Sequence, residues 1–342
     1  MAAVLLFFAA CAPKDGEYAE PRFRKVEQRD FTILGEELMH SVVGAEAAWQ
    51  DHLILMSNDR APGNNIHFYS KRTGAWELST LPTGRSAGEI TLALDIQVMG
   101  DTLYVFDANP PRLKRYSLPA LLAQGPMAEA FLGEIPMSDR SMIWAGVAPD
   151  RMVVVTSLSP RAGPDHTPRI LWTGPDGPVA SYDEYPYEDR NLSWTQYSTA
   201  FPYFALSPDG SKLALSTTWG CVMELFSLSH GEIVRKHCLY WVDPGFVQGK
   251  PASTSRVGLS RIMATDDGFI TSFFNEEKDF ETGRPACDRI AFFDWEGRGL
   301  RCIQTGGYSA APISFDKAEN TLYALLWDKD HVVMYLGKMI LD

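Results

Sequence analysis

The sequence predicts an all-β protein, a six-bladed β-propeller with about four antiparallel strands in each blade. Three observations predict it: a turn followed by an apolar strand recurs six times, each recurrence is followed by more strand-like stretches, and helical periodicity is scarce. Blades of this kind bury their faces only against neighbouring blades, so the ring must close. A two-sheet sandwich is the competing fold, but it would not require one long period repeated six times.

The repeated phrase is the strongest of these signals. Its markers, spaced 50, 50, 59, 56 and 54 residues apart, are Ile54, Tyr104, Val154, Leu213, Phe269 and Tyr323. Turn residues such as Asp, Asn, Gly and Pro precede the strands, and they tolerate or preset the dihedral angles of a tight turn. The strands themselves are rich in β-branched and aromatic residues. We therefore expect the phrase to be the turn between the innermost and second strands of each blade.

The other strands of a blade can be read between the markers. The first unit continues with strand-like stretches at 65–70 and 75–79, and the fifth unit ends with 289–295 and 300–305. One short turn of helix is expected at 119–123. Because the six copies use nearly the whole chain, we expect one closed domain over residues 27–342 and not two separate domains.

At the N-terminus, residues 1–10 are an apolar run that ends in Ala9-Ala10 and is followed by Cys11. This segment resembles the end of a bacterial lipoprotein signal peptide, in which the cysteine is acylated. Phe8 stands where the family usually has Leu, and the basic segment of a signal peptide is missing. An ordinary N-terminus with a chance cysteine is the alternative. The resemblance implies a signal segment at 1–11, a linker at 12–26 and a lipid-anchored protein of the bacterial cell envelope, on its periplasmic side or surface.

Three motifs within the repeats are S-P-D-G at 207–210 before K-L-A-L-S, G-D-T-L-Y-V-F-D at 100–107, and G-R-S-A-G-E at 84–89 before I-T-L-A-L-D. Together they resemble the TolB-like six-bladed propeller lipoproteins, which are known mainly from Bacteroidetes. The last motif matches only in part, since the family generally has a G-x-G-P-G-E type sequence there. The resemblance covers most of residues 27–342 and implies a fold and a location, without a reaction.

Four cysteines remain if Cys11 is lipidated. Cys221 and Cys238 lie on two strand-like stretches joined by a turn, so a disulfide between them is possible, and two buried thiols are the alternative. The histidines and cysteines do not show zinc spacing.

Composition excludes some classes of function. The 342 residues include 31 Lys and Arg against 43 Asp and Glu, a net charge of −12, and this acidic balance disfavours nucleic acid as a partner. After the first ten residues no apolar run approaches the roughly 20 residues needed to span a bilayer. We expect a monomer that reaches the membrane only through its anchor and binds a small molecule or an envelope protein.

Residues at the ends of the second strands and in the connectors between blades are expected to share one face of the propeller. The candidate ligand-binding residues on that face are Arg60, Arg85, Asn109, Arg140, Tyr187, Arg190, Trp219, Arg256, Asn275 and Trp327. Four of the arginines occupy four different connectors and would converge on one mouth of the channel. Arginine binds carboxylate and phosphate in bidentate fashion, which suggests an anionic or sugar-acid ligand. Alternatively, each arginine pairs with an acid of its own loop, such as Glu89.

The connector at 182–201 is unusually long and aromatic, with five Tyr and Trp residues. Loops of this length without regular structure are usually functional or disordered. This one is too aromatic for disorder, and it could equally be a lid over the channel or a plug within it.

The leading functional hypothesis is therefore a binding or scaffold module without a catalytic residue, a cofactor or a metal. No nucleophile elbow, dinucleotide fingerprint or phosphate-binding loop is present. The runner-up is a propeller hydrolase or lyase that acts on a lactone or sugar acid, with calcium held by Asn109, Asn275 and Asp328 as in six-bladed lactonases.

Overall fold

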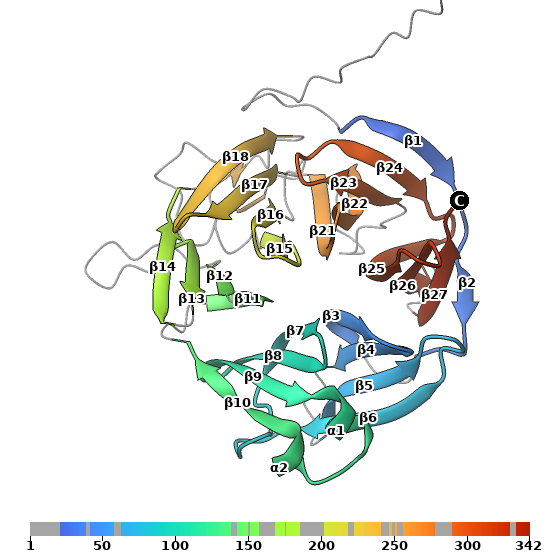
Figure 1. The fold of residues 1–342 in the computed structure, drawn as a ribbon. Coiled ribbons are helices and arrows are strands. Elements are labelled where there is room, and N and C mark those ends of the chain that lie inside the picture. Colours follow the sequence, from blue (N-terminus) through green and yellow to red (C-terminus); the bar gives the residue numbers. More distant parts are fainter. Residues whose placement is uncertain are drawn as a thin grey trace, which may run out of the picture.

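A computed structural model shows the fold of the chain (Figure 1). It describes residues 21–38, 42–57, 63–137, 142–149, 151–156, 168–174, 176–184, 202–217, 222–240, 246–247, 250–251, 256–277, 289–328 and 333–342.

Six sheets of four antiparallel strands stand in a ring, which confirms the predicted propeller. From the channel outward, the first three blades are β3 (Val42–Trp49), β4 (His52–Ser57), β5 (Asn64–Ser70) and β6 (Trp76–Pro82); β7 (Ala93–Met99), β8 (Thr102–Ala108), β9 (Pro111–Ser117) and β10 (Phe131–Pro136); and β11 (Met142–Ala148), β12 (Arg151–Thr156), β13 (Ile170–Gly174) and β14 (Gly177–Tyr182).

The other three blades complete the ring. Their strands are β15 (Pro202–Leu206), β16 (Lys212–Thr217), β17 (Val222–Ser229) and β18 (Glu232–Tyr240); β21 (Arg256–Thr265), β22 (Gly268–Glu277), β23 (Arg289–Asp294) and β24 (Gly299–Gln304); and β25 (Tyr308–Asp316), β26 (Thr321–Asp328), β27 (Met334–Ile340) and β2 (Thr32–Leu34). A separate hairpin is formed by β19 (Phe246–Val247) and β20 (Lys250–Pro251).

The N-terminal segment closes the ring. β1 (Phe23–Gln28) runs parallel to β24 as a fifth strand of blade five, and β2 then pairs with β27 as the outer strand of blade six. Arg29 donates a hydrogen bond to the carbonyl of Ile340 at 3.0 Å and pairs with the carboxylate of Asp342. The start of the chain therefore holds blades five and six together. β1 begins inside the segment 12–26 that the sequence assigns to a linker.

Six apolar clusters fill the six seams between neighbouring blades. β4 shows how one strand serves two seams. Ile54 and Met56 pack toward blade two, whereas Leu53 and Leu55 pack toward blade six. Side chains alternate between the two faces of a strand, and both faces are covered here, so consecutive residues of the strand are all buried. The core is thus a ring of seams around the channel.

Polar side chains add at least one link at every seam. One such link for each seam is Trp49–Asp101 at 3.0 Å, Gln97–Val147 at 2.7 and 2.8 Å, Arg169–Glu224 at 3.1 Å, Lys212–Glu296 at 3.6 Å, Ser272–Ala310 at 2.7 Å and Lys71–Asp316 at 3.1 Å.

Two short helices lie between β9 and β10. The helix α1 (Leu118–Leu122) confirms the turn of helix expected at 119–123, and α2 (Met127–Ala130) was not expected. The Ser117 hydroxyl accepts a hydrogen bond from the backbone N–H of Ala120, as an N-cap does. Among the described residues, no helix is both long enough and apolar enough to cross a membrane.

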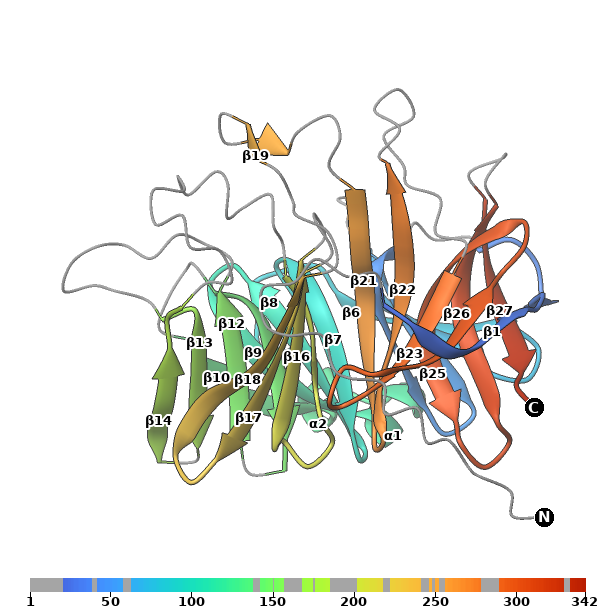
Figure 2. The same cartoon turned by 90° about the horizontal axis from the view of Figure 1, so that it is seen from above.

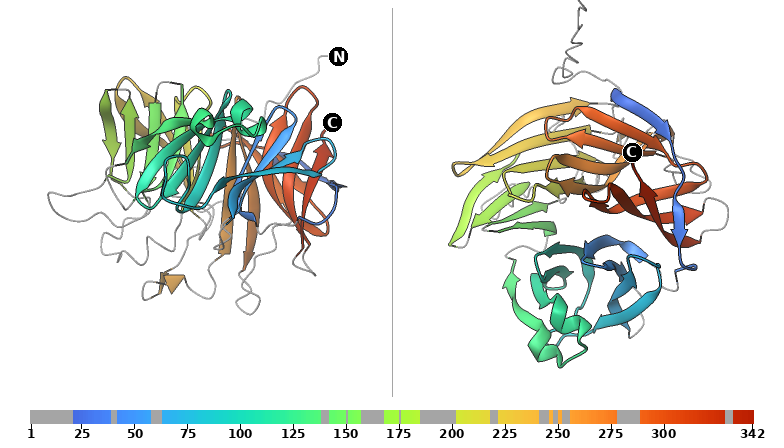
Figure 3. Two further views of the ribbon diagram at one scale, coloured as in Figure 1. Left: turned by 90° about the horizontal axis from the view of Figure 1, so that it is seen from below. Right: turned by 45° about the vertical axis from the view of Figure 1, so that its right-hand side comes forward.

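The two faces of the ring carry different connections (Figure 2). We call the face with the turns between first and second strands the turn face, and the face with the connectors between blades the connector face. The repeated sequence phrase lies at the turns between first and second strands on the turn face, as predicted. The helices lie on the turn side, and the β19–β20 hairpin lies on the connector side (Figure 3).

Candidate functional site

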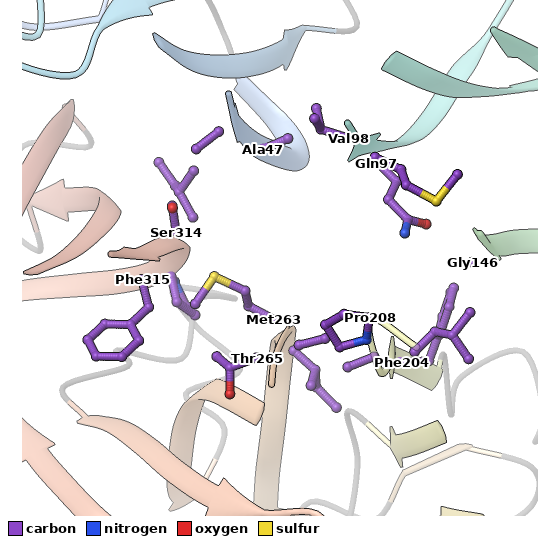
Figure 4. A pocket seen from close by; sticks show the side chains of 18 of the residues that line it. Ala47, Gln97, Val98, Gly146, Phe204, Pro208, Met263, Thr265, Ser314 and Phe315 are labelled. Carbon is purple, nitrogen blue, oxygen red and sulfur yellow. The ribbon is translucent and has the colours of Figure 1, made fainter. Parts of the chain in front are cut away.

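A cavity of about 550 Å³ occupies the central channel, and all six inner strands line it. Each blade contributes at least one residue to its wall: Ala47, Gln97, Gly146, Phe204, Met263 and Ser314, in blade order (Figure 4). Because every blade contributes, the cavity exists only in the closed ring.

The cavity lies toward the turn face. Its lining comes from the later parts of the inner strands, which run toward that face, and from the turns themselves through Pro208, Asp266 and Lys317. The sequence placed the binding residues on the connector face. The cavity formed by the described residues therefore lies at the opposite end of the channel from the predicted site.

Small residues leave room along the channel wall. Ala47, Ala145, Gly146 and Ala205 all line the cavity. At Gly146 a Cβ atom would come within 2.7 Å of the Phe204 ring on the neighbouring inner strand. The glycine therefore lets β11 and β15 approach each other closely.

Gln97 makes one part of the wall rigid. Its Nε2 donates to the carbonyl of Val147 at 2.7 Å, and its Oε1 accepts from the N–H of Val147 at 2.8 Å. The side-chain amide thus pairs with the backbone of β11 as another strand would. This pair joins blades two and three at the edge of the cavity.

Charged residues of both signs line the cavity. Lys317 and Asp267 form an ion pair at 2.6 Å, and the hydrogen bond from Lys317 to Asp267 raises the pKa of the lysine, so these two charges offset each other. Asp95 on β7 and Arg261 on β21 also line the cavity. Contacts between inner strands run β7–β11–β15–β21, which puts blades two and five on opposite sides of the ring. The channel is therefore lined by an acidic residue on one wall and by a basic residue on the other.

Arg261 has an unusual backbone for a residue within a strand. Ser260 pairs with Ser272 and Ile262 with Thr271, so Arg261 is the extra residue of a β-bulge. Its φ is +54°, in the left-handed region that glycine tolerates and other residues mostly avoid. The side chain is half-buried. A bulge of this kind turns a side chain away from the direction that regular alternation would give it.

The sequence-predicted residues that the structure describes fully lie away from the cavity. Arg85 and Asn109 are exposed in connections of the connector face, and Trp327 is half-buried against the cluster between blades six and one. Arg256 and Asn275 lie in β21 and β22, but their side chains are outside the described part of the chain. Wholly outside it are Cys11, Arg60, Arg140, Tyr187, Arg190, Trp219 and Cys221. The convergence of these residues on one mouth stays a prediction, and so does the choice between lid and plug for the connector at 182–201.

The connector that carries Arg85 is held firmly by its own loop and by blade two. Glu89 accepts a hydrogen bond from the backbone N–H of Ser86 at 2.8 Å, and the backbone hydrogen bonds of the loop lower its pKa. Tyr116 donates to the carbonyl of Gly88 at 3.2 Å, and the buried Asp107 accepts from the backbone of the connector. Glu89 therefore holds its own backbone, and the predicted pairing of Glu89 with Arg85 is not found between these two described side chains.

Two further sequence expectations concern cysteines and calcium. The hairpin register puts Cys238 directly across from Glu224, and Cys221 lies outside the described residues, so the disulfide stays a prediction. Asp328 lies at the end of β26 and is half-buried. In the described part of the chain, no group of three His, Cys, Asp or Glu side chains is placed to hold a metal ion. The calcium arrangement, which relies on two asparagines, stays a prediction.

One serine–histidine pair lies outside the channel. The Ser57 hydroxyl is 2.6 Å from Nε2 of His67, and the Ser79 hydroxyl is 2.7 Å from Nδ1 of the same ring. The pair is enclosed within blade one, where Ser57 is fully buried and His67 is 2 % exposed. A nucleophile must reach its substrate, so this pair satisfies buried polar groups and is not a catalytic dyad.

The sequence did not point to Asp95, Gln97 and Arg261 because they lie in inner strands, whereas the predicted residues lie at the ends of second strands and in connectors. A visible signal was the pair of polar residues at alternating positions in L-A-L-D-I-Q-V-M, since a buried strand has little reason to carry them.

Comparisons with known proteins agree with the fold. No protein-family model and no curated protein matches the chain. A solved structure of a Bacteroides fragilis protein thought to be exported is similar over 93% of this chain and 99% of its own, with a TM-score of 0.55 and 10% identity. A Lactobacillus plantarum protein is similar over 87% of this chain and 82% of its own, with a TM-score of 0.50 and 12% identity. At such low identity the two likenesses show a shared fold, and the chain has the architecture of a six-bladed β-propeller.

Proposed function

We propose that the protein is a binding module of the bacterial cell envelope, anchored through a lipid on Cys11, which takes a small anionic or sugar-acid ligand into its central channel. One observation carries the ligand part of the proposal. A cavity lined by all six inner strands has an acidic residue, Asp95, and a basic residue, Arg261, on opposite walls.

The size of the cavity favours a small molecule over a protein partner. Ligand pockets commonly have volumes of about 300–1,000 Å³, and the channel cavity has about 550 Å³. Its wall also combines apolar surface, from Phe204 and Met263, with a few charged groups, which is the usual composition of a ligand site.

The charges favour an anion that also carries hydroxyl groups. A guanidinium binds a carboxylate in bidentate fashion, and Arg261 lines one wall. A carboxylate accepts hydrogen bonds from hydroxyl groups, and Asp95 lines the other wall. A sugar acid has both groups on one small frame.

Ligand binding is tested by the thermal unfolding of the full chain with glucuronate or galacturonate, and with glucose as the neutral control. A ligand that binds only the folded state at about 100 times its Kd stabilises by about 2.7 kcal/mol. We expect the melting temperature to rise with either uronate and not with glucose. An unchanged melting curve with both uronates, or an equal rise with glucose, would contradict the proposal.

The lipid anchor is tested separately by membrane fractionation of cells that express the wild type or a Cys11→Ser variant. We expect the wild type in the membrane fraction and the variant in the soluble fraction, because the thiol that carries the acyl chain is lost. Equal membrane association of both forms would overturn the anchor and would leave the ligand proposal intact.

A further inference from the structure

We infer that the outer rim of blade five is a membrane-contact surface, which holds the ring against anionic phospholipid headgroups beside the lipid anchor. The surface, which we call the basic edge, consists of Arg22, Arg24 and Lys25, at and just before the beginning of β1. The inference rests on the anchor of the proposed function and deepens it, because it says which side of the ring lies against the membrane.

The segment that forms β1 is basic in an acidic protein. Residues 22–29 contain four basic residues and one acidic residue, whereas the whole chain has a net charge of −12. The one acidic residue is Glu27, and three basic side chains already pair with it: Lys25 at 2.9 Å, Arg29 at 2.9 Å and Arg301 at 3.1 Å. The segment therefore keeps an excess of positive charge.

Arg22 and Arg24 are exposed, and the fold does not use their side chains. In the described part of the chain, neither side chain has a hydrogen bond, an ion pair or a ring contact. Val26 is 62 % exposed, and because side chains alternate along a strand it lies on the same side of β1 as Arg24. An exposed apolar side chain beside unpaired cations suits the surface of an anionic bilayer, where apolar burial and attraction to headgroups both contribute to binding.

The other outer strands show that such cations are not a general feature of the ring. β1 is the edge strand of its sheet, and charged side chains commonly protect an edge strand from pairing with another chain. Four other outer strands, β2, β6, β10 and β14, nevertheless contain no Lys or Arg. The outer strand β18 ends beside the beginning of β1 and carries the exposed Lys236 (Figures 1 and 3). Positive charge therefore gathers on the outer rim of blades four and five.

The position of the anchor favours the same side of the ring. Cys11 lies 11 residues before Arg22. An extended chain covers at most about 3.6 Å per residue, so a lipid on Cys11 stays within about 40 Å of the basic edge. β1 lies on the outer rim of the ring and not on its turn face or connector face (Figure 1). Contact with the membrane through β1 therefore covers neither face.

The chemistry of the basic edge favours phospholipid headgroups as its partner. A guanidinium binds a phosphate in bidentate fashion, and two of the three residues are arginines. Each Lys or Arg close to an anionic membrane strengthens binding about fivefold. The contact is electrostatic, so we expect it to disappear at about 1 M salt, where the Debye length is about 3 Å. Membranes washed in such salt should keep the protein only through its lipid.

The test measures co-sedimentation with phosphatidylglycerol vesicles, with phosphatidylcholine vesicles as the neutral control. It uses the mature chain that the proposed processing leaves, residues 11–342, with Cys11→Ser so that no lipid contributes. In about 0.1 M salt the Debye length is about 10 Å, which screens the acidic residues on the far side of the ring. We expect binding to phosphatidylglycerol alone. No binding to either vesicle, or equal binding to both, would overturn the inference.

Two variants with equal changes of charge locate the contact. Arg22→Gln combined with Arg24→Gln removes two cations from the basic edge, whereas Arg72→Glu lowers the net charge by the same amount in the exposed turn between β5 and β6. We expect the double variant to bind phosphatidylglycerol vesicles about 10- to 30-fold more weakly, and the Arg72 variant to bind within about 3-fold of the unsubstituted chain. Equal binding by the double variant and the unsubstituted chain would contradict the assignment.

Sedimentation velocity without vesicles separates membrane contact from protection of the edge strand. We expect the unsubstituted chain and both variants to be monomers. A double variant that dimerises would show that the cations keep β1 from pairing with a second copy, and would overturn the inference. The anchor is decided by fractionation of the Cys11→Ser variant with salt-washed membranes, and the basic edge by the vesicles, so each can fail without the other.

Discussion

The seams between blades and the wall of the channel use polar side chains in different ways. At the seam between blades three and four, Arg169 donates to both carboxylate oxygens of Glu224, and Arg235 donates to the same carboxylate. Arg169 is 6 % exposed and Glu224 is 1 % exposed. In the channel, Asp95 and Arg261 are half-buried on opposite walls.

The difference separates the charges that hold a buried seam together from the charges that line the cavity. A buried charge must be matched within the protein, because water cannot solvate it. Asp95 and Arg261, by contrast, line the cavity that a ligand would enter. Substitutions at the seams should therefore change stability, and substitutions on the channel wall should change binding.

The largest expected effect is at the buried seam. Glu224→Ala leaves the guanidinium of Arg169 buried without its carboxylate, and loss of one partner of a buried pair costs about 3–5 kcal/mol. The free energy of unfolding, measured by urea denaturation, should fall by this amount, while glucuronate binding by the folded fraction stays unchanged.

A matched control comes from the ion pair between blades four and five. Lys212 and Glu296 are 3.6 Å apart, and their side chains are 42 % and 51 % exposed. Exposed pairs contribute about 0–1 kcal/mol, so Lys212→Gln should hardly change the free energy of unfolding. Similar losses for Glu224→Ala and Lys212→Gln would contradict the distinction between buried and exposed links.

Gln97 belongs both to a seam and to the channel wall, because it joins blades two and three and also lines the cavity. Gln97→Leu removes its two hydrogen bonds to Val147 and leaves the N–H and C=O groups of that residue without these partners, at a cost of about 1–3 kcal/mol. We expect a lower urea midpoint together with weaker glucuronate binding, since the wall of the cavity moves. A variant that loses neither stability nor affinity would show that the amide bridge does not shape the cavity.

The smallest effect concerns the ion pairs of Arg29 with Glu27 and Asp342, which join the two ends of the chain and which we call the clasp. Partial burial alone would favour protonated Glu27, but hydrogen bonds from Lys25 and Arg29 and the charge of Arg301 outweigh it and lower its pKa. The hydrogen bond from Arg29 likewise lowers the pKa of Asp342. Both folded-state pKa values lie below the ordinary values of 4.5 and 3.8, so the clasp contributes its full stability above these values and loses it as the pH falls through the lowered values.

The melting temperature of the wild type and of an Arg29→Gln variant, recorded from pH 6 to pH 3, checks this direction. The variant should melt below the wild type at pH 6, and the two curves should approach each other toward pH 3. A difference in melting temperature that grows as the pH falls would contradict the role of the clasp.

The sequence predicted the ring well because the signals for its turns and strands are local. The phrase Pro208-Asp209-Gly210 specifies a turn by its own chemistry, since the Asp209 carboxylate accepts hydrogen bonds from Ser211 and the side chain of Ser207. Strands such as β4 are continuous apolar runs because both of their faces are buried in seams, and such runs are visible in the sequence.

The closure and the site were harder to predict. β1 pairs with β24, a strand more than 270 residues away in the chain, and the short stretch F-R-K-V-E-Q gives no sign of its partner. The bulge at Arg261 depends on how β21 fits between its neighbours, while the sequence S-R-I-M-A-T reads as an ordinary strand. The predicted arginines followed from the loops alone, where the sequence cannot show which side chains meet.

The central claim, a carboxylate site inside the channel, is tested most directly by crystals of the protein soaked with 4-iodobenzoate, whose iodine gives an anomalous signal. The account predicts an anomalous peak within the central cavity, with the carboxylate against Arg261. Anomalous peaks confined to the outer surface of the ring, with an empty channel, would contradict it.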